Sequence, residues 1–153
     1  MTPIEKDKLI NLLPHKGRMF LLDRAVDIDY DEYSIKTQVD VTKESMFYDE
    51  TLGGIPSYVT FEYMAQSISA LSGIDNNRKG LPPKVGVILS VSEFKTIIPV
   101  LKEGTTVTVS VCQQDIVDRV FSFTCTAYIG DELVSSGKLT VMEVDDLREL
   151  GIK

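Results

Sequence analysis

Hydrophobic and polar residues alternate over two neighbouring segments near the start of this chain. The first segment covers residues 20–30 and the second covers residues 33–41. Strict alternation is typical of a strand with one buried and one exposed face. Asp31 and Glu32, which lie between the two segments, therefore predict a hairpin turn that makes the strands antiparallel neighbours.

The C-terminal half of the chain contains further strand-like segments. Residues 106–111, 121–129 and 133–142 alternate in the same way, and Gly130-Asp131 predicts a turn between the last two. The run from Val85 to Leu89 differs, because every position in it is apolar or glycine. Such a run is typical of a strand buried on both faces. We therefore expect about four strands in this half, one of them fully buried.

One long apolar segment, Ser57 to Ile74, has the pattern of a buried helix. Its polar residues Glu62, Gln66 and Ser69 fall at positions i, i+4 and i+7, which places them on one stripe of the helix. Ser57 is a natural N-cap for this helix. The polar stripe argues against a membrane span in spite of the length of the segment.

A short helix is predicted for Thr2 to Leu13, ahead of the first strand. The element order is then a short helix, two strands, one long helix and about four strands. This order indicates a single α+β domain over residues 1–153, with an antiparallel sheet of about six strands wrapped around one long central helix. One helix cannot cover six strands, so we expect a homodimer and leave a higher oligomer open.

Composition and charge narrow the classes of partner and compartment. The 153 residues carry a formal net charge of −7, which argues against nucleic acid as the main partner. The start of the chain lacks the pattern of a secretory signal, so a cytoplasmic location is expected. Cys112 and Cys125 lie in strand-like runs without metal-ligand spacing, and we expect them to be small core residues. Neither a metal nor a cofactor is predicted.

Two ionisable residues are candidates for chemistry. Glu62 lies among apolar residues of the long helix, and burying an unpaired carboxylate costs several kcal/mol. It therefore requires a partner, a water molecule or a functional reason. His15 is the only histidine in the chain and follows Pro14, where a helix cap or a surface position is the alternative to a functional role.

Three short strings in the right order resemble a known family. They are Leu13-Pro14-His15, Phe20-Leu21-Leu22-Asp23-Arg24 and Glu62-Tyr63-Met64-Ala65-Gln66. Together they resemble the β-hydroxyacyl-acyl-carrier-protein dehydratases, which have the hot-dog fold, and the likeness runs almost end to end. The resemblance implies a hot-dog fold for this chain.

The loop before the long helix departs from the best-known members of that family. Those dehydratases carry their catalytic His in a Gly-His-Phe-Pro-Gly stretch, whereas the loop from Tyr48 to Pro56 contains no His. The chain is more similar to a divergent branch, the dehydratase-like proteins of aryl-polyene-type pathways. In that branch the His of the Leu-Pro-His string, here His15, is the candidate base.

The resemblance implies a lyase of fatty acid biosynthesis type that removes water from a 3-hydroxyacyl thioester on acyl carrier protein, giving the trans-2-enoyl thioester. His15 is then expected to take the C2 proton, and Glu62 to protonate the departing C3 hydroxyl. Backbone N–H groups at the start of the helix are expected to hold the thioester oxygen. The expected substrate-binding set is Gly53, Gly54, Ile55, Pro56, Ser57, Tyr58 and Gln66, and Gln66 has the alternative role of satisfying backbone or cross-dimer hydrogen bonds.

Two other functions remain open for the same residues. The first is a hot-dog acyl thioesterase, in which Glu62 activates water or attacks the thioester without help from a His. The second is a non-catalytic acyl-binding or partner subunit. The fold cannot distinguish the three functions, because function depends on the site.

Overall fold

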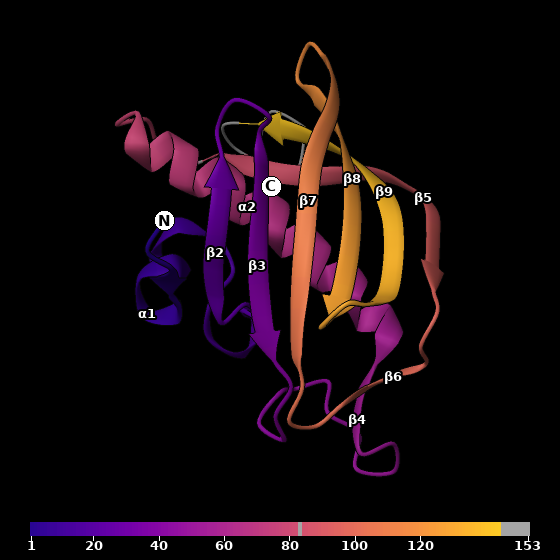
Figure 1. Ribbon diagram of the computed structural model, residues 1–153. Helices are drawn as coiled ribbons and strands as arrows, with labels where there is room; N and C mark the ends of the chain where they lie inside the picture. The colour runs from indigo at the N-terminus through magenta and orange to yellow at the C-terminus, as the bar shows by residue number, and fades with distance from the viewer. Residues whose placement is uncertain (83, 145–153) are drawn as a thin grey trace, which may run out of the picture.

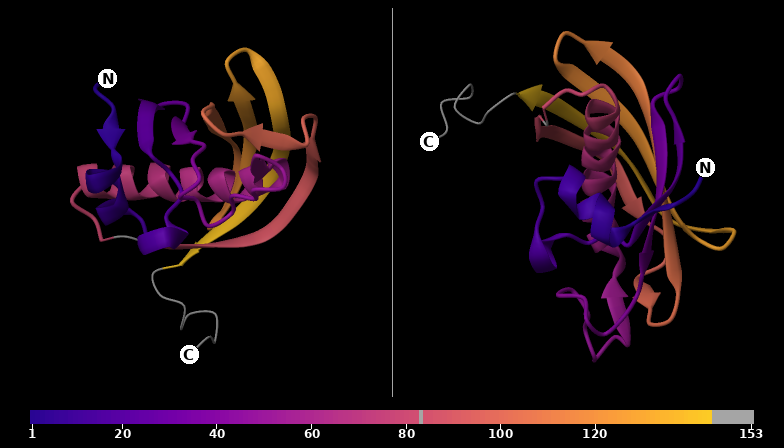
Figure 2. Two further views of the ribbon diagram at one scale, coloured as in Figure 1. Left: turned by 90° about the horizontal axis from the view of Figure 1, so that it is seen from below. Right: turned by 90° about the vertical axis from the view of Figure 1, so that its left-hand side faces the viewer.

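A curved antiparallel sheet wraps around one long helix in the computed structural model, which describes residues 1–82 and 84–144. Helix α2, Thr60–Arg78, lies on the concave face of the sheet (Figures 1 and 2). The sheet has the order β1-β2-β3-β7-β8-β9-β5. Its strands are β1 Ile4–Glu5, β2 Arg24–Asp29, β3 Ser34–Asp40, β5 Val85–Thr96, β7 Thr106–Val117, β8 Val120–Ile129 and β9 Glu132–Val144. The predicted architecture is confirmed.

Shorter elements complete the described chain. A separate two-stranded sheet is formed by β4, Gly54–Pro56, and β6, Val100–Lys102. The short helices are α1 Lys6–Leu9, η1 Ile10–Leu12, η2 Gly17–Met19 and η3 Ser57–Val59. The predicted N-terminal helix is therefore confirmed but shorter than Thr2 to Leu13, because Ile4 and Glu5 pair with β2 as a seventh, two-residue strand.

The alternating strands bury the residues that their pattern predicts. Val107, Val109 and Val111 of β7 have no exposed surface, and Cys125 and Ala127 of β8 are equally buried. These side chains face α2, which is joined to the sheet by pairs of buried hydroxyls. Thr37 and Ser67 lie 2.7 Å apart, as do Thr60 and Ser135, measured between their side-chain oxygens.

The predicted hairpin lies between β2 and β3, which pair antiparallel from Asp29↔Ser34 onward. One carboxylate oxygen of Asp29 accepts the backbone N–H groups of Asp31 and Glu32, each at 3.0 Å. An Asp side chain that binds backbone N–H groups two and three residues later stabilises a tight turn. The turn therefore forms at the two polar residues that the sequence indicates.

The start of the long helix differs from the prediction. Ser57 does not cap α2, because its hydroxyl donates to the carbonyl oxygen of Ile98 and its backbone N–H donates to Pro99 at 3.0 Å. The helix is preceded instead by the 3₁₀ turn η3. Just before this turn, the backbone at Gly54 lies close to Leu101. Only glycine fits there, since a Cβ would lie 2.0 Å from the carbonyl oxygen of Leu101.

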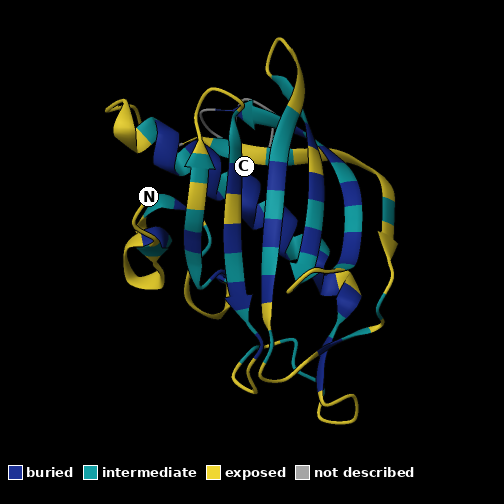
Figure 3. Cartoon of the chain, in the orientation of Figure 1, coloured by how far each residue is buried: buried dark blue, intermediate teal, exposed yellow. Residues whose placement is uncertain are grey.

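The expectation that Val85 to Leu89 are buried on both faces is wrong for the single chain. These residues form part of β5, which pairs on one side only, with β9. Ile88, Leu89 and Val91 are 39%, 51% and 40% exposed. Figure 3 shows the exposed stretches along this edge. The apolar run signals burial, but no described part of the chain supplies it.

The last described strand, β9, extends to Val144. Glu143 pairs with Gly86, and Val144 pairs with Val85. Within the described residues, no helix is long and apolar enough to cross a membrane.

Candidate active site

His15 and Glu62 line one cavity of about 120 Å³ between α2 and the β5–β9 edge of the sheet. The cavity follows α2 from Glu62 to Ser72, which are about 15 Å apart along the axis at 1.5 Å per residue. Its other lining residues are Ala65, Ile68, Ser69, Lys84, Gly86, Ile88, Val141 and Glu143. The two candidate catalytic residues, 47 positions apart in the sequence, are therefore brought to one site.

The turn that carries His15 is held by its neighbour Lys16. The Lys16 ammonium donates to the carbonyl oxygen of Leu13 at 2.9 Å and also to that of Ile10. Both carbonyls belong to the segment just before His15. Lys16 therefore fixes the backbone on the N-terminal side of the candidate base.

Gln66 holds the segment on the other side of His15. Its side-chain amide donates to the carbonyl oxygen of Met19 at 2.7 Å and accepts the backbone N–H of Leu21 at 2.8 Å. The side chain is 1% exposed. The alternative role predicted for Gln66, satisfying backbone hydrogen bonds, is the one observed, and its amide ties this segment to α2 one turn after Glu62.

His15 is half-buried, and its Nδ1 atom is buried without a hydrogen-bond partner among the described residues. Burial lowers the pKa of His15 below 6.5, because the imidazolium loses water, and the negative charge of Glu62 offsets only part of this effect. The imidazole is therefore neutral at pH 7. A neutral imidazole is the form that accepts a proton.

Glu62 is half-buried at the third residue of α2 and forms no ion pair within the described part of the chain. The negative charge of Glu62 acts on His15, where it offsets part of the pKa lowering that burial causes. The requirement for a partner that the sequence suggests is therefore met by the cavity and by His15. A carboxyl and an imidazole on one cavity can act as an acid–base pair.

The residues predicted to hold the thioester are placed beside the helix start, not on this cavity. Gly54 and Ile55 belong to the β4–β6 ladder, and the Ser57 N–H is already bound to Pro99. Tyr58 is 67% exposed. Pro56 belongs to the same ladder and has no N–H, and Gly53 precedes it, so the backbone N–H of Tyr58 remains the candidate donor of the predicted set.

Ser69, which the sequence places on one stripe with Glu62, lines the cavity, whereas other lining residues were missed by sequence reasoning. Ala65 and Ser72 lie at i+3 and i+10 from Glu62, so their small size on one helix face was a usable signal. Lys84 and Glu143 could not be found in this way, because they meet only through the pairing of β5 with β9. Within the described residues, no group of three or more His, Cys, Asp or Glu side chains is placed to hold a metal ion.

Comparisons with known proteins agree on fold and family type. A family model described as ApeP dehydratase, ApeP-like, matches residues 8–151. The chain is 27% identical over 139 residues to the 3-hydroxyacyl-[acyl-carrier-protein] dehydratase FabZ of Chlamydia trachomatis, with 88% of each protein covered.

Solved structures show the same fold. A chain of the dehydratase heterocomplex ApeI:P from Xenorhabdus doucetiae superposes with a TM-score of 0.85 at 21% identity, covering 95% of this chain and 97% of that one. A probable thioesterase from Bartonella henselae superposes with a TM-score of 0.56 at 13% identity, covering 72% and 90%. Both likenesses concern the hot-dog fold, which different chemistries share.

Proposed function

Since this chain belongs to the ApeP-like dehydratase family, we propose that it removes water from a 3-hydroxyacyl thioester carried by acyl carrier protein in the cytoplasm. The product is the trans-2-enoyl thioester. The observation that supports this proposal is the shared cavity of His15 and Glu62. Glu143 is a second carboxyl in the lining, but the charge that acts on His15 is that of Glu62.

His15 acts as the base. Its lowered pKa keeps the imidazole neutral at pH 7, so it can accept the C2 proton of the substrate. Breaking the C2–H bond leaves an enolate-like thioester oxygen, which requires a hydrogen-bond donor. The N–H of Tyr58, in the first turn ahead of α2, is the candidate for this role.

Glu62 acts as the acid. The reactive form of the site is the one in which Glu62 carries a proton. Glu62 donates this proton to the C3 hydroxyl, the C3–O bond breaks, water leaves and the C2–C3 double bond forms. At the end of the reaction His15 carries the former C2 proton, and the proton of Glu62 has left in the water molecule. A proton transfer between them, directly or through water in the shared cavity, restores both groups for the next turnover.

We also propose that the working unit is a homodimer joined along β5. This strand leaves one edge unpaired in the described chain and exposes three large apolar side chains, and Ile88 also lines the cavity. A second copy pairing with β5 satisfies the edge and closes the cavity beside Ile88. A mass in light scattering that stays monomeric at micromolar concentration contradicts this arrangement. Dimerisation only with a different hot-dog chain contradicts it as well.

The deciding experiment is incubation of the purified protein with a 3-hydroxyacyl chain on a carrier protein, followed by mass spectrometry. Loss of one water from the acyl group is the expected result. Release of the free acid identifies a thioesterase instead, and unchanged substrate with measurable binding identifies a non-catalytic subunit. His15→Gln and Glu62→Gln are the matched controls, since both retain a hydrogen-bonding side chain.

A further inference from the structure

Two stretches of this acidic chain carry no acidic residue. They are residues 8–22 and 76–92, in a protein with a net charge of −7. Each stretch contains three cations and each contributes to the lining of the His15–Glu62 cavity, through His15 and through Gly86 and Ile88. A negatively charged partner of the cavity therefore has two possible approaches.

The cations of the second stretch have carboxylates beside them. Arg78 and Lys79 both bind the carboxylate of Asp75, with N–O distances of 2.7 and 3.0 Å. Burial opposes ionisation of Asp75, but the hydrogen bonds from Arg78 and Lys79 outweigh it and keep the pKa of this carboxyl below its usual value. Lys84 lines the cavity together with Glu143. Arg78 and Lys79 are therefore already held by an ion pair within the chain.

The cations near His15 are exposed. Lys16 and Arg18 belong to the first stretch and Lys6 lies just before it, and the Lys16 ammonium also binds the backbone carbonyl of Leu13. Lys6 and Arg18 line a common cleft of about 340 Å³, which places them on one side of the molecule. Neither Lys6 nor Arg18 forms an ion pair with a described residue. Met19, which follows Arg18, is 57% exposed. We call Lys6, Lys16, Arg18 and Met19 the N-terminal rim.

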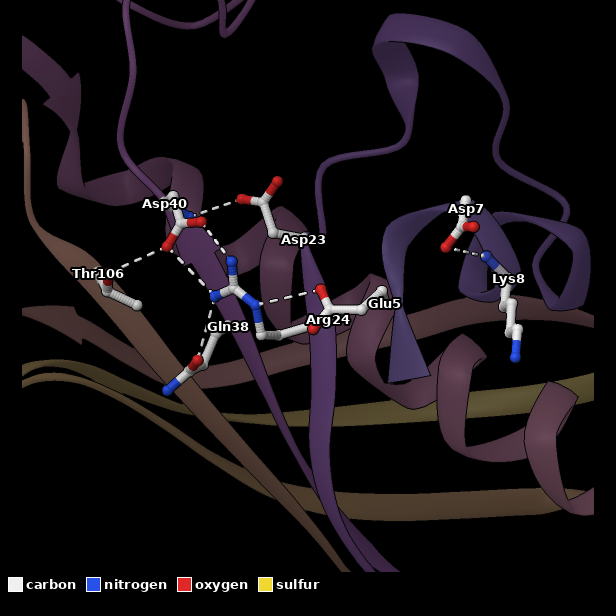
Figure 4. A network of polar contacts seen from close by, with 8 residues as sticks. All are labelled: Glu5, Asp7, Lys8, Asp23, Arg24, Gln38, Asp40 and Thr106. Atoms are coloured by element: carbon white, nitrogen blue, oxygen red, sulfur yellow. Dashed lines mark hydrogen bonds and ion pairs between the residues drawn. The ribbon is translucent and has the colours of Figure 1, made fainter. Parts of the chain in front are cut away.

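Carboxylates also line this cleft, but two of the three are engaged elsewhere. Asp40 is bound by Arg24, and Asp23 accepts the backbone N–H of Asp40 at 2.6 Å (Figure 4). Glu44 is the exposed carboxylate of the cleft. The N-terminal rim therefore differs from the second stretch by its unpaired cations, because Lys6, Lys16 and Arg18 form no ion pair with a described residue. Glu5 and Asp7, on either side of Lys6, and Glu44 are the exposed carboxylates nearby.

The position of the rim fits the path of a carrier-bound substrate. The reacting carbons must lie at His15 and Glu62, and the cavity continues from there along α2 towards Ser72, which leaves room for the acyl tail. The thioester arm must then leave at the His15 end. Lys16 and Arg18 follow His15 by one and three residues. The arm begins at a phosphodiester, which is an anion on every carrier protein, and Arg recognises phosphate well.

On this basis we propose that the N-terminal rim is the docking surface for the carrier protein, with Lys6, Lys16 and Arg18 facing its acidic surface and phosphodiester, and Met19 giving an apolar contact. The inference rests on the proposed function, because it takes the substrate to be carrier-bound. Lys16 and Gln66 hold the rim in a fixed position relative to the cavity, since they bind the backbone on the two sides of His15. Complementary charge at such a surface mainly accelerates association.

The test is binding of a 3-hydroxyacyl carrier protein to wild type and to the double variant Lys6→Glu/Arg18→Glu, measured by fluorescence anisotropy. Lys16 is left unchanged because it holds the His15 turn. The double reversal is expected to weaken binding by about tenfold and to flatten its salt dependence. The control is Lys36→Glu on the exposed face of β3, which is expected to change binding less than twofold. Unchanged thermal unfolding confirms that the variants are folded.

A second readout separates this inference from the proposed function. Turnover of a 3-hydroxyacyl N-acetylcysteamine thioester, which has neither carrier nor phosphate, is expected to be equal in wild type and the double variant. If wild type dehydrates neither substrate, the proposed function fails while carrier binding still decides the docking surface. Docking at the rim is overturned if the double variant binds the carrier normally, if no carrier binding occurs, or if Lys84→Glu alone abolishes binding.

Discussion

Two sets of polar side chains on helix α2 have opposite surroundings. Thr60, Gln66 and Ser67 are buried, and each makes at least two hydrogen bonds at 2.7 or 2.8 Å to the sheet, the helix or the His15 loop. Glu62, two residues after Thr60, has only a cavity and the unpartnered imidazole of His15 beside it. A satisfied polar group stabilises the fold, whereas a polar group left open onto a cavity is suited to a ligand.

The largest expected effect distinguishes these roles at Glu62 itself. Glu62→Gln keeps the shape of the side chain and removes the ionisable proton, so turnover should fall by on the order of a hundredfold or more. Thermal unfolding should be unchanged or move to higher temperature, because an amide costs less to desolvate than a carboxylate. Full activity in this variant would end the proposed mechanism, and lost stability would make Glu62 a structural residue.

The next largest effect is a loss of stability, expected at one of the buried, hydrogen-bonded side chains of α2. Gln66→Leu leaves the Leu21 N–H and the Met19 carbonyl without their partner, so the free energy of unfolding should fall by about 2 kcal/mol. Urea unfolding measures this loss. Ser69→Ala, on the cavity stripe of the same helix, is the control and should change stability by less than about 0.5 kcal/mol. Equal effects of the two substitutions would erase the contrast between the two sets.

A smaller effect is expected for the hydroxyl pair that joins α2 to β9. Thr60→Val leaves the buried Ser135 hydroxyl without its partner and should cost about 1–2 kcal/mol in the free energy of unfolding. Adding Ser135→Ala removes the orphaned hydroxyl and should recover much of the loss. A double variant less stable than the sum of the two single losses would contradict this pairing.

The smallest effect concerns the titration of His15, followed by NMR as the signal of the sole histidine. Its pKa should lie below 6.5 in wild type and lower still in Glu62→Gln, because that substitution removes the charge that favours the imidazolium. Between the folded pKa and 6.5 the unfolded state binds more protons, so stability should rise with pH in this window. A pKa that Glu62→Gln leaves unchanged would show that the two residues do not interact.

The parts of the fold that local patterns determine were predictable from sequence. Val107, Val109 and Val111 alternate because one face of β7 is buried by the same chain. The prediction that Val85 to Leu89 are buried on both faces was wrong because an apolar residue indicates burial without saying which molecule provides it. The sequence predicts Ser57 as a helix cap because capping propensity is local, but the nearby carbonyl of Ile98 is a tertiary partner that no local pattern reveals.

The site was predictable only in part for the same reason. The roles of His15 and Glu62 were predicted from short sequence strings that resemble a dehydratase family, and the structure brings both residues to one cavity. The opposite wall depends on strand register, because Gly86 faces Glu143 only through the pairing of β5 with β9. A register between strands 50 or more residues apart leaves no mark that a single sequence can show.

The pairing of β5 also sets an order of events during synthesis. Thr96, the last residue of β5, is made 48 residues before Val144, the last residue of its partner strand β9. At roughly 5–20 residues per second, the nascent strand waits about 2–10 s for that partner. Its apolar edge resembles the segments that template aggregation, so the newly made chain should depend on chaperones or rapid assembly. Yield from cells should therefore fall as elongation is slowed, which lengthens this interval, or as the temperature is raised.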